Sequence, residues 1–427
     1  MHFNDMSPSV AALAMLFSGL LPSVLASTCS NATQSAPHAR TSQGLVKGYH
    51  DASCNSVFLG IPFAATTAGE NRWRTPQDVP KSNTTVIATS YGPTCPQAIS
   101  GTLYSQQDEN CLNLNIWAPS TGENLPVFVY MYGGAMVTGS SSNHQLQGSN
   151  FARNGVIYVN FNTRESIFAS PHSSELSETS PEESQNFSIL DVEKALDWVR
   201  DNIHAFGGNP DHIVFGGHSS GAVQVDHYLW NHPDSWLKGA VQMSANAMSG
   251  PGYAPVNQGL DAVAAEAGCP KAGDNQVECL RSVDSYAFQT ADFNSTFNTC
   301  AKQDTWVYRF FGAYDNVVGV PGTAPTHGTE VPFFHGGNEC FDSLTGVTEA
   351  QQALADSIHG WFVDWIKNPA AGPGWAKGSP QSGPLVKLGV PGDELSAIQG
   401  LTGDFNARCK SVYAPAFPKY PVIQSPL

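Results

Sequence analysis

The chain has 427 residues, of which 41% are apolar and 13% are charged, and its formal net charge is −16. This length and apolar content allow a large buried core and exclude a mainly disordered chain. The acidic balance argues against nucleic acids and anionic membranes as partners, but it leaves neutral small molecules open.

The first segment, residues 1–26, is typical of a secretory signal peptide. An apolar run from Val10 to Leu21 is too short to span a membrane and precedes the small-residue cleavage pattern Val24-Leu25-Ala26. Because the segment lacks Lys and Arg and carries Asp5, a buried N-terminal helix is the alternative interpretation. No later run reaches the length of a transmembrane helix. We therefore expect a secreted, extracellular protein with no stable membrane span.

Glycosylation sequons and cysteines agree with export. The Asn-X-Ser/Thr sequons lie at Asn31, Asn83, Asn186 and Asn294. Nine cysteines would pair in an oxidising compartment, and their odd number leaves at least one thiol without an intramolecular partner. These cysteines are Cys29, Cys54, Cys95, Cys111, Cys269, Cys279, Cys300, Cys340 and Cys409.

Apolar runs predict the strands of an α/β fold. They begin at Ser56, Leu125, Val156, His212, Gly239 and Thr305. Because continuous apolar strands alternate with helices, they favour a mostly parallel central sheet with helices on both faces. A helix with apolar residues at helical spacing is predicted from Ser188 to the stop at Gly207-Gly208, and the polar, acidic residues 170–185 predict a surface loop. No linker or repeat divides residues 27–427, which are expected to form a single domain.

One motif places a serine between a strand and a helix. The apolar residues 213–215 are followed by Gly217-His218-Ser219-Ser220-Gly221 and then by a segment with helical pattern. Glycines on both sides of the serine let strand and helix approach closely, so that the Ser219 hydroxyl projects from the sheet beside the Ser220 N–H. A glycine- and serine-rich loop is the alternative, and the surrounding motifs decide between the two.

Several blocks along the chain occur in a recognisable order. They are "FLGIPFA" with "NRWRTP", "TCPQ" with "DENCLNLNIWAP", "LPVFVYMYGGAMVTGS", "LDWVRDNIHAFGGNPDHIVFGGHSSG", "AEAGCPKAGDNQVECLRS" and "THGTEVPFF". This order, from about Thr41 to about Trp375, resembles that of the type-B carboxylesterase/lipase family of α/β-hydrolases, which includes cholinesterases and fungal secreted lipases.

The resemblance implies a secreted serine hydrolase that cleaves small-molecule or lipid carboxylic esters through an acyl-enzyme. Ser219 matches the family's nucleophile and His327 its general base, while Gly134, Ala135 and Ser220 match the backbone donors of the oxyanion hole. The family's disulfides match Cys95–Cys111 and Cys269–Cys279, which leaves the pairing of Cys29, Cys54, Cys300, Cys340 and Cys409 undefined. No metal ligand cluster or phosphate-binding glycine loop is evident, so we expect no cofactor.

Three positions near the nucleophile depart from the family's pattern. Ala135 stands where the family usually has a third glycine, but it keeps its N–H. Ser220 stands where alanine is frequent, and His218 replaces a usual glutamate.

The family's catalytic acid has no counterpart in the sequence. The interval between Ser219 and His327 is much shorter than in the family, and it lacks the strand and turn that carry the acidic residue. Substitutes in the interval are Glu278, Asp284, Asp292, Asp304 and Asp315. None follows an apolar strand, so no catalytic acid is assigned.

The absence of this strand and turn between Ser219 and His327 has a structural and a functional implication. We expect the run 306–311 to join the sheet beside the run 239–245, in the place of the missing strand. Three functions stay open: an active esterase, a catalytically impaired or non-catalytic binding relative, and an incomplete gene model of an active enzyme.

Overall fold

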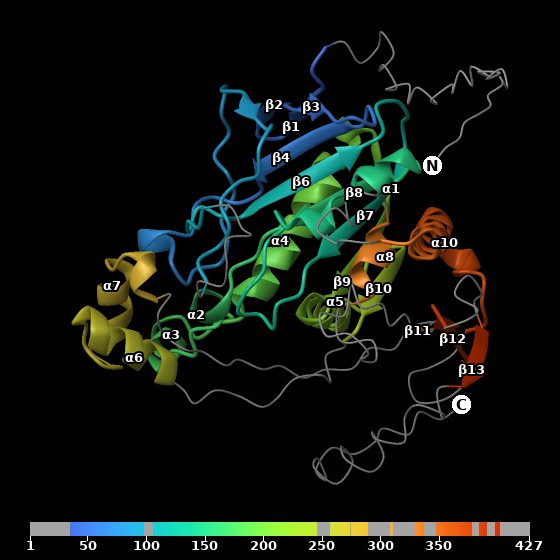
Figure 1. Ribbon diagram of the computed structural model, residues 1–427. Coiled ribbons are helices and arrows are strands. Elements are labelled where there is room, and N and C mark those ends of the chain that lie inside the picture. Colours follow the sequence, from blue (N-terminus) through green and yellow to red (C-terminus); the bar gives the residue numbers. More distant parts are fainter. Residues whose placement is uncertain are drawn as a thin grey trace, which may run out of the picture.

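The computed structural model describes residues 35–97, 106–245, 257–273, 275–288, 308–310, 329–336, 347–377, 384–390 and 398–401 (Figure 1). Several predicted features lie outside these residues: the signal segment, Asn31, Asn294, His327, Cys29, Cys300, Cys340 and Cys409. Among the helices that are described, none has both the length and the apolar character needed to cross a membrane.

A mixed sheet of seven strands forms the centre of the fold, in the order β10-β9-β7-β8-β6-β4-β3. The half that contains β10, β9, β7 and β8 is parallel, whereas β6, β4 and β3 are added in antiparallel register. The bounds are β3 Tyr49–His50, β4 Ser56–Pro62, β6 Asn113–Ala118, β7 Leu125–Met131, β8 Ile157–Phe161, β9 Gly208–His218 and β10 Gly239–Met243.

Side chains alternate between the two faces of this sheet and bury both. Phe215 of β9 packs edge-on against Tyr228 of α5, with ring centroids 6.0 Å apart. Phe128 of β7 packs on the opposite side against Phe151 of α1 and Phe334 of α8, with centroids 5.3 and 5.8 Å apart. Helices therefore cover both faces, as the sequence predicts.

The helices are listed here by their bounds: α1 Ser149–Arg153, α2 Ser166–Ala169, α3 Ser174–Thr179, α4 Phe187–Asn202, α5 Ser220–Asn231, α6 Gln258–Ala267, α7 Gln276–Arg281, α8 Val331–His335 and α10 Glu349–Lys367. Short 3-10 turns are η2 Gly69–Asn71, η3 His144–Leu146, η4 Ile203–Phe206, η5 Ser285–Phe288 and η6 Pro369–Ala371. The predicted helix is confirmed as α4 with η4, and it ends at Gly207, whose φ is 86°. The predicted loop 170–185 contains α3, which begins at the side-chain cap of Ser173 and buries Leu176.

Two hydrophobic cores result. The larger one lies around the central sheet, and a smaller one lies beneath α2, α3, α6 and α7. Figure 1 shows α6 and α7 at one end of the molecule and α10 at the other. The N-terminal part of the chain forms a separate small sheet of the order β1-β2-β5. Its strands are β1 His38–Thr41, β2 Gly44–Lys47 and β5 Val86–Ile87.

The prediction for the run 306–311 is wrong. Within this run, β11 (Tyr308–Phe310) pairs in parallel with β12 (Pro384–Leu388), which pairs with β13 (Ile398–Leu401) in a separate sheet. The rings of Tyr308 and Phe310 pack on Phe362 and Phe333, with centroids 5.8 and 5.2 Å apart. These contacts hold β11 against α10 and α8. Among the described strands, β10 therefore pairs with β9 alone.

Helices α8 and α10 bring two buried histidines under the sheet. The Nδ1–H of His335 donates to the Val331 carbonyl at 3.1 Å, so its Nε2 accepts from the Tyr158 hydroxyl at 3.0 Å. His359 donates through Nδ1 to the Phe334 carbonyl at 3.0 Å. Burial lowers the pKa of His335 to about 3 and that of His359 to about 4. Both rings are therefore neutral in the folded protein near neutral pH.

The disulfides and exposed sequons agree with the sequence analysis. Disulfides join Cys95 to Cys111 and Cys269 to Cys279, as predicted from the resemblance. Cys54 is also disulfide-bonded, and its partner lies outside the described residues. The side chains of Asn83 and Asn186 are exposed, as a glycosylated asparagine must be.

Candidate active site

Ser219 sits at the sharp turn that joins β9 to α5. Its backbone has φ 54° and ψ −125°, a sparsely populated conformation for a residue with a side chain. The Ser219 N–H donates to the Met243 carbonyl of β10 at 2.8 Å, and its own carbonyl accepts from the Val223 N–H at 3.1 Å. The turn is thus held from both sides, with the serine partly exposed.

The glycines of the motif have the close contacts that the sequence predicts. A Cβ on Gly217 would lie 2.5 Å from the carbonyl carbon of Gly221. A Cβ on Gly221 would lie 2.3 Å from the carbonyl oxygens of Met131 and Tyr132. Only residues without a side chain fit at these distances, so the strand–serine–helix turn depends on both glycines.

The loop after β7 passes directly beside this turn. A Cβ on Gly133 would lie 2.6 Å from both the His218 carbonyl oxygen and the Ser219 Cβ. The Gly134 carbonyl then accepts from the N–H groups of Val137 and Thr138, each at 3.1 Å. These bonds close the loop tightly next to the serine. The predicted oxyanion residues and the predicted nucleophile are therefore brought together.

The next two residues of the loop have left-handed backbone conformations. The φ of Ala135 is 58° and that of Met136 is 60°. The methyl group of Ala135 is exposed, whereas the side chain of Met136 is buried, and the Met136 carbonyl accepts from the Ser166 N–H at 2.8 Å. Left-handed conformations cost alanine and methionine about 1 kcal/mol each relative to glycine. The loop is thus strained, and its contacts with neighbouring segments maintain it.

A hydrogen bond joins the loop to α5. The Gly134 N–H donates to the Oγ of Ser220 at 3.0 Å. Sequence reasoning assigns Ser220 through its backbone N–H alone, so this role of its side chain is a finding of the structure.

A buried carboxyl lies beneath the same loop. Glu165 is 1% exposed, and its neighbours include the hydroxyls of Tyr132 and Thr163. Desolvation is the main reason why the pKa of Glu165 is raised well above its usual value, with the charge of Asp191 adding to it. Tyr132 precedes Gly133 directly, and a Cβ on Gly139 would lie 2.4 Å from its ring. Glu165 and Tyr132 thus form part of the buried surface on which the loop packs.

A second buried carboxylate faces the residue before the nucleophile. The Nε2 of His218 lies 3.8 Å from the Oε1 of Glu330, and the two side chains are 11% and 9% exposed. The Ser244 hydroxyl donates to the same carboxylate oxygen. This contact connects the ends of β9 and β10 to the residues just before α8. Glu330 stands in the quoted "THGTEVPFF" block, but nothing in the sequence pairs it with His218.

The described residues contain one half of the predicted catalytic arrangement. Ser219, Ser220, Gly134 and Ala135 lie together, whereas His327 is outside the described residues. Among the substitutes for the missing acid, Glu278 and Asp284 are exposed, on α7 and just after it. Figure 1 shows α7 far from α5. Asp292, Asp304 and Asp315 lie outside the described residues.

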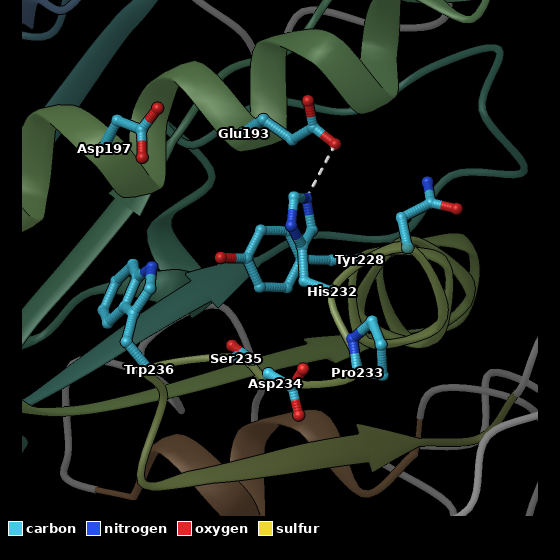
Figure 2. Close-up of a pocket in the computed structure, with 9 residues that line it drawn as sticks. Glu193, Asp197, Tyr228, His232, Pro233, Asp234, Ser235 and Trp236 are labelled. Carbon is cyan, nitrogen blue, oxygen red and sulfur yellow. Dashed lines mark hydrogen bonds and ion pairs between the residues drawn. The ribbon is translucent and has the colours of Figure 1, made fainter.

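A pocket of about 390 Å³ lies at the other end of α5 (Figure 2). It contains a serine, a histidine and carboxylates, the residue types of a second catalytic group. His232 contacts Glu193 with Nε2 3.0 Å from Oε1. The Ser235 Oγ, however, accepts from the Leu237 N–H at 3.3 Å, and the serine is not in a strained turn beside a donor loop. The geometry around Ser219 is therefore the better candidate for chemistry.

Comparisons with known proteins identify the family of the chain. A family model described as the carboxylesterase family matches residues 35–300. A para-nitrobenzyl esterase of Bacillus subtilis (strain 168) is 38% identical over 192 residues, which are 43% of this chain and 38% of the esterase. A secreted lipase of Arthroderma benhamiae is 38% identical over 181 residues, which are 40% of this chain and 32% of the lipase. The matched parts thus span about a third of the length of each of these two relatives.

A solved structure of a PNB esterase superposes on this chain with a TM-score of 0.69 at 20% sequence identity. The superposition covers 86% of this chain and 97% of the esterase chain. The likeness establishes a common fold.

Proposed function

This chain belongs to the carboxylesterase family, and from that premise we propose that it hydrolyses carboxylic esters through an acyl-enzyme formed on Ser219. The observation that carries the proposal is the strained turn at Ser219, packed against the Gly133–Gly134–Ala135 loop. A serine hydroxyl held at such an apex beside a glycine-containing loop is the arrangement that acyl transfer requires.

The proposed reaction has two steps. The Ser219 hydroxyl attacks the ester carbonyl while His327 accepts its proton, and backbone amides of the loop and of Ser220 stabilise the oxyanion. His327 then protonates the leaving alcohol. Water, activated by the same imidazole, attacks the acyl-serine and releases the carboxylic acid. The proposed substrate is a small-molecule or lipid ester, in line with the names of the esterase and lipase relatives.

Secretion is part of the proposal. It is supported by the apolar run within residues 1–26, by two disulfides and by the exposed sequons at Asn83 and Asn186. Residues 27–427 would form the mature α/β-hydrolase domain.

A catalytically impaired binding protein is the second candidate. The observation that favours it is the position of Glu278 and Asp284, which are exposed and away from the serine. A triad without its acid keeps the serine–histidine pair and the oxyanion donors, but it loses about four powers of ten in rate.

The test compares the full chain with a Ser219→Ala variant. A fluorophosphonate probe reports whether the serine is nucleophilic, and a short nitrophenyl ester reports turnover. We expect labelling and hydrolysis that both depend on Ser219. Equal hydrolysis by the two proteins would refute the proposal, and labelling without turnover would favour the impaired protein. Sequencing the transcript between the codons for Phe288 and Asp292 tests the gene-model alternative.

A further inference from the structure

The backbone N–H of Gly134 has a side-chain partner in this protein. It donates to the Ser220 Oγ at 3.0 Å, across the gap between the loop and the first residue of α5. An amide that donates to a hydroxyl is less available to a substrate oxygen. The oxyanion hole would therefore have one backbone donor fewer than the resemblance to the family implies.

The hydroxyl that takes this N–H has a hydrogen of its own. A serine hydroxyl has one donor and two acceptor sites, and the bond from Gly134 fills an acceptor site. Among the described residues, no acceptor contacts the Ser220 hydroxyl hydrogen. Ser220 is partly exposed, so the hydrogen can turn toward a bound molecule.

Ser220 lies next to the nucleophile, so its hydroxyl is close to the reacting atoms. Ser220 follows Ser219 directly, and its backbone N–H is the predicted donor at the start of α5. An oxygen bound at that N–H lies close to the Oγ of the same residue. In addition, a hydroxyl that accepts a hydrogen bond becomes a stronger donor, because a chain of hydrogen bonds polarises its members.

We propose that the Ser220 hydroxyl is a catalytic donor of the oxyanion hole, which takes the N–H of Gly134 and offers its own O–H to the substrate oxyanion in its place. The inference rests on the proposed function and adds a side-chain donor to it. No bond to Ser220 is made or broken, because its hydroxyl only donates a hydrogen bond that strengthens as the carbonyl oxygen becomes an alkoxide.

The test uses Ser220→Ala, which removes the hydroxyl, and Ser220→Thr, which keeps it. We expect Ser220→Ala to lower kcat for a nitrophenyl ester about tenfold to a hundredfold, with KM within about twofold of the wild type, because the donor acts on the transition state. Ser220→Thr should keep most of the wild-type kcat. A trifluoromethyl ketone, which forms a tetrahedral adduct with Ser219, should lose affinity for Ser220→Ala by the same factor as kcat.

The controls separate a chemical effect from a loss of folding. Ser357→Ala removes a half-buried hydroxyl that donates to the Ala353 carbonyl within α10, far from Ser219 in the chain, and should leave kcat unchanged. Thermal melting of every variant gives the folded fraction at the assay temperature, to which kcat is normalised.

The outcomes are distinct. If the wild type shows Ser219-dependent turnover and Ser220→Ala is as fast or faster, the inference is wrong, and Gly134 donates to the oxyanion itself. Equal losses in Ser220→Ala and Ser220→Thr would overturn it too, because the hydroxyl would then not be the cause. Absence of any Ser219-dependent turnover would refute the proposed function, and the inference with it.

Discussion

At Gly133 the loop after β7 comes into close contact with the turn that carries the nucleophile. A Cβ there would lie 2.6 Å from the Ser219 Cβ and from the His218 carbonyl oxygen, which is too close for these atoms to stay in place. We expect Gly133→Ala to lower kcat/KM at least a hundredfold, because even small displacements of reacting groups are costly. Ester hydrolysis by the purified variant is the measurement.

The matched control is Gly360→Ala in α10, where an added Cβ meets nothing within 4 Å. Alanine in a helix interior stabilises by about 0.5–1 kcal/mol relative to glycine. This variant should therefore unfold at higher urea and keep full activity. Comparable activity losses in both glycine variants would contradict the close approach at Gly133.

The buried carboxyl of Glu165 should make the folded protein less stable at alkaline pH. Burial raises its pKa above the unfolded value, so the stability it contributes is full below the unfolded pKa and is lost as the pH rises through the folded pKa. Glu165→Gln is a neutral substitute that cannot ionise. We expect the variant to match the wild type near pH 4 and to exceed it increasingly toward pH 9. Urea unfolding across this range is the measurement, and a constant difference would contradict the expectation.

At the scale of elements, the packing of α8 and α10 makes the fold sensitive to acid. The pKa values of His335 and His359, about 3 and about 4, lie below that of an unfolded histidine. The stability that the two neutral histidines contribute is therefore fully present above pH 6.5, and it is lost as the pH falls toward their pKa values in the folded protein. His335 alone should cost roughly 4 kcal/mol by about pH 3.5.

A His335→Gln variant tests this expectation, because an amide stays neutral and can still accept from the Tyr158 hydroxyl. Its free energy of unfolding, measured by urea between pH 7 and pH 4, should fall less steeply than that of the wild type. Identical slopes would show that His335 does not set the acid sensitivity.

Sequence patterns identify those helices and strands in which the apolar residues are also the buried ones. Strands β7, β8 and β9 are apolar runs, and α4 has helical spacing with a glycine stop. The sequence does not predict strand β6, because Asn113 and Asn115 interrupt its apolar residues. Both are buried, and Asn115 donates to Asn160 at 2.8 Å. Its polar groups are satisfied by partners that no local pattern contains.

In the candidate site, too, the sequence predicts the local motifs but not the contacts between distant residues. The serine turn and the oxyanion loop are local motifs, so the resemblance placed Ser219, Ser220, Gly134 and Ala135 in the sequence. The contacts of His218 with Glu330 and of Gly134 with Ser220 join residues far apart in the chain. Such pairs depend on the three-dimensional arrangement, and sequence periodicity says nothing of them.

At the scale of the whole molecule, Arg72 joins segments that belong to the two cores. Its Nε donates to Glu109 at 2.7 Å, and its Nη1 donates to the carbonyls of Leu280 and Val283. Arg72 and Glu109 are both buried. Removing one member of a buried ion pair leaves the other charge without compensation, at a cost of about 3–5 kcal/mol.

We therefore expect Arg72→Met to lower the free energy of unfolding by this amount, and the double variant Arg72→Met/Glu109→Met to recover much of it. Urea unfolding of the two variants and the wild type is the measurement. A double variant no more stable than Arg72→Met would show that the carbonyl contacts, and not the charge pair, carry the effect.

The bond from the Ser219 amide to Met243 ties the nucleophile to β10, which within the described part of the chain is an outermost strand. Border strands of a sheet open locally at a lower free energy than interior ones. Brief fraying of β10 would release the serine while the interior strands stay protected. On gradual warming, catalysis should consequently fade before the molecule as a whole melts, and amide hydrogen exchange should be faster in β10 than in β7.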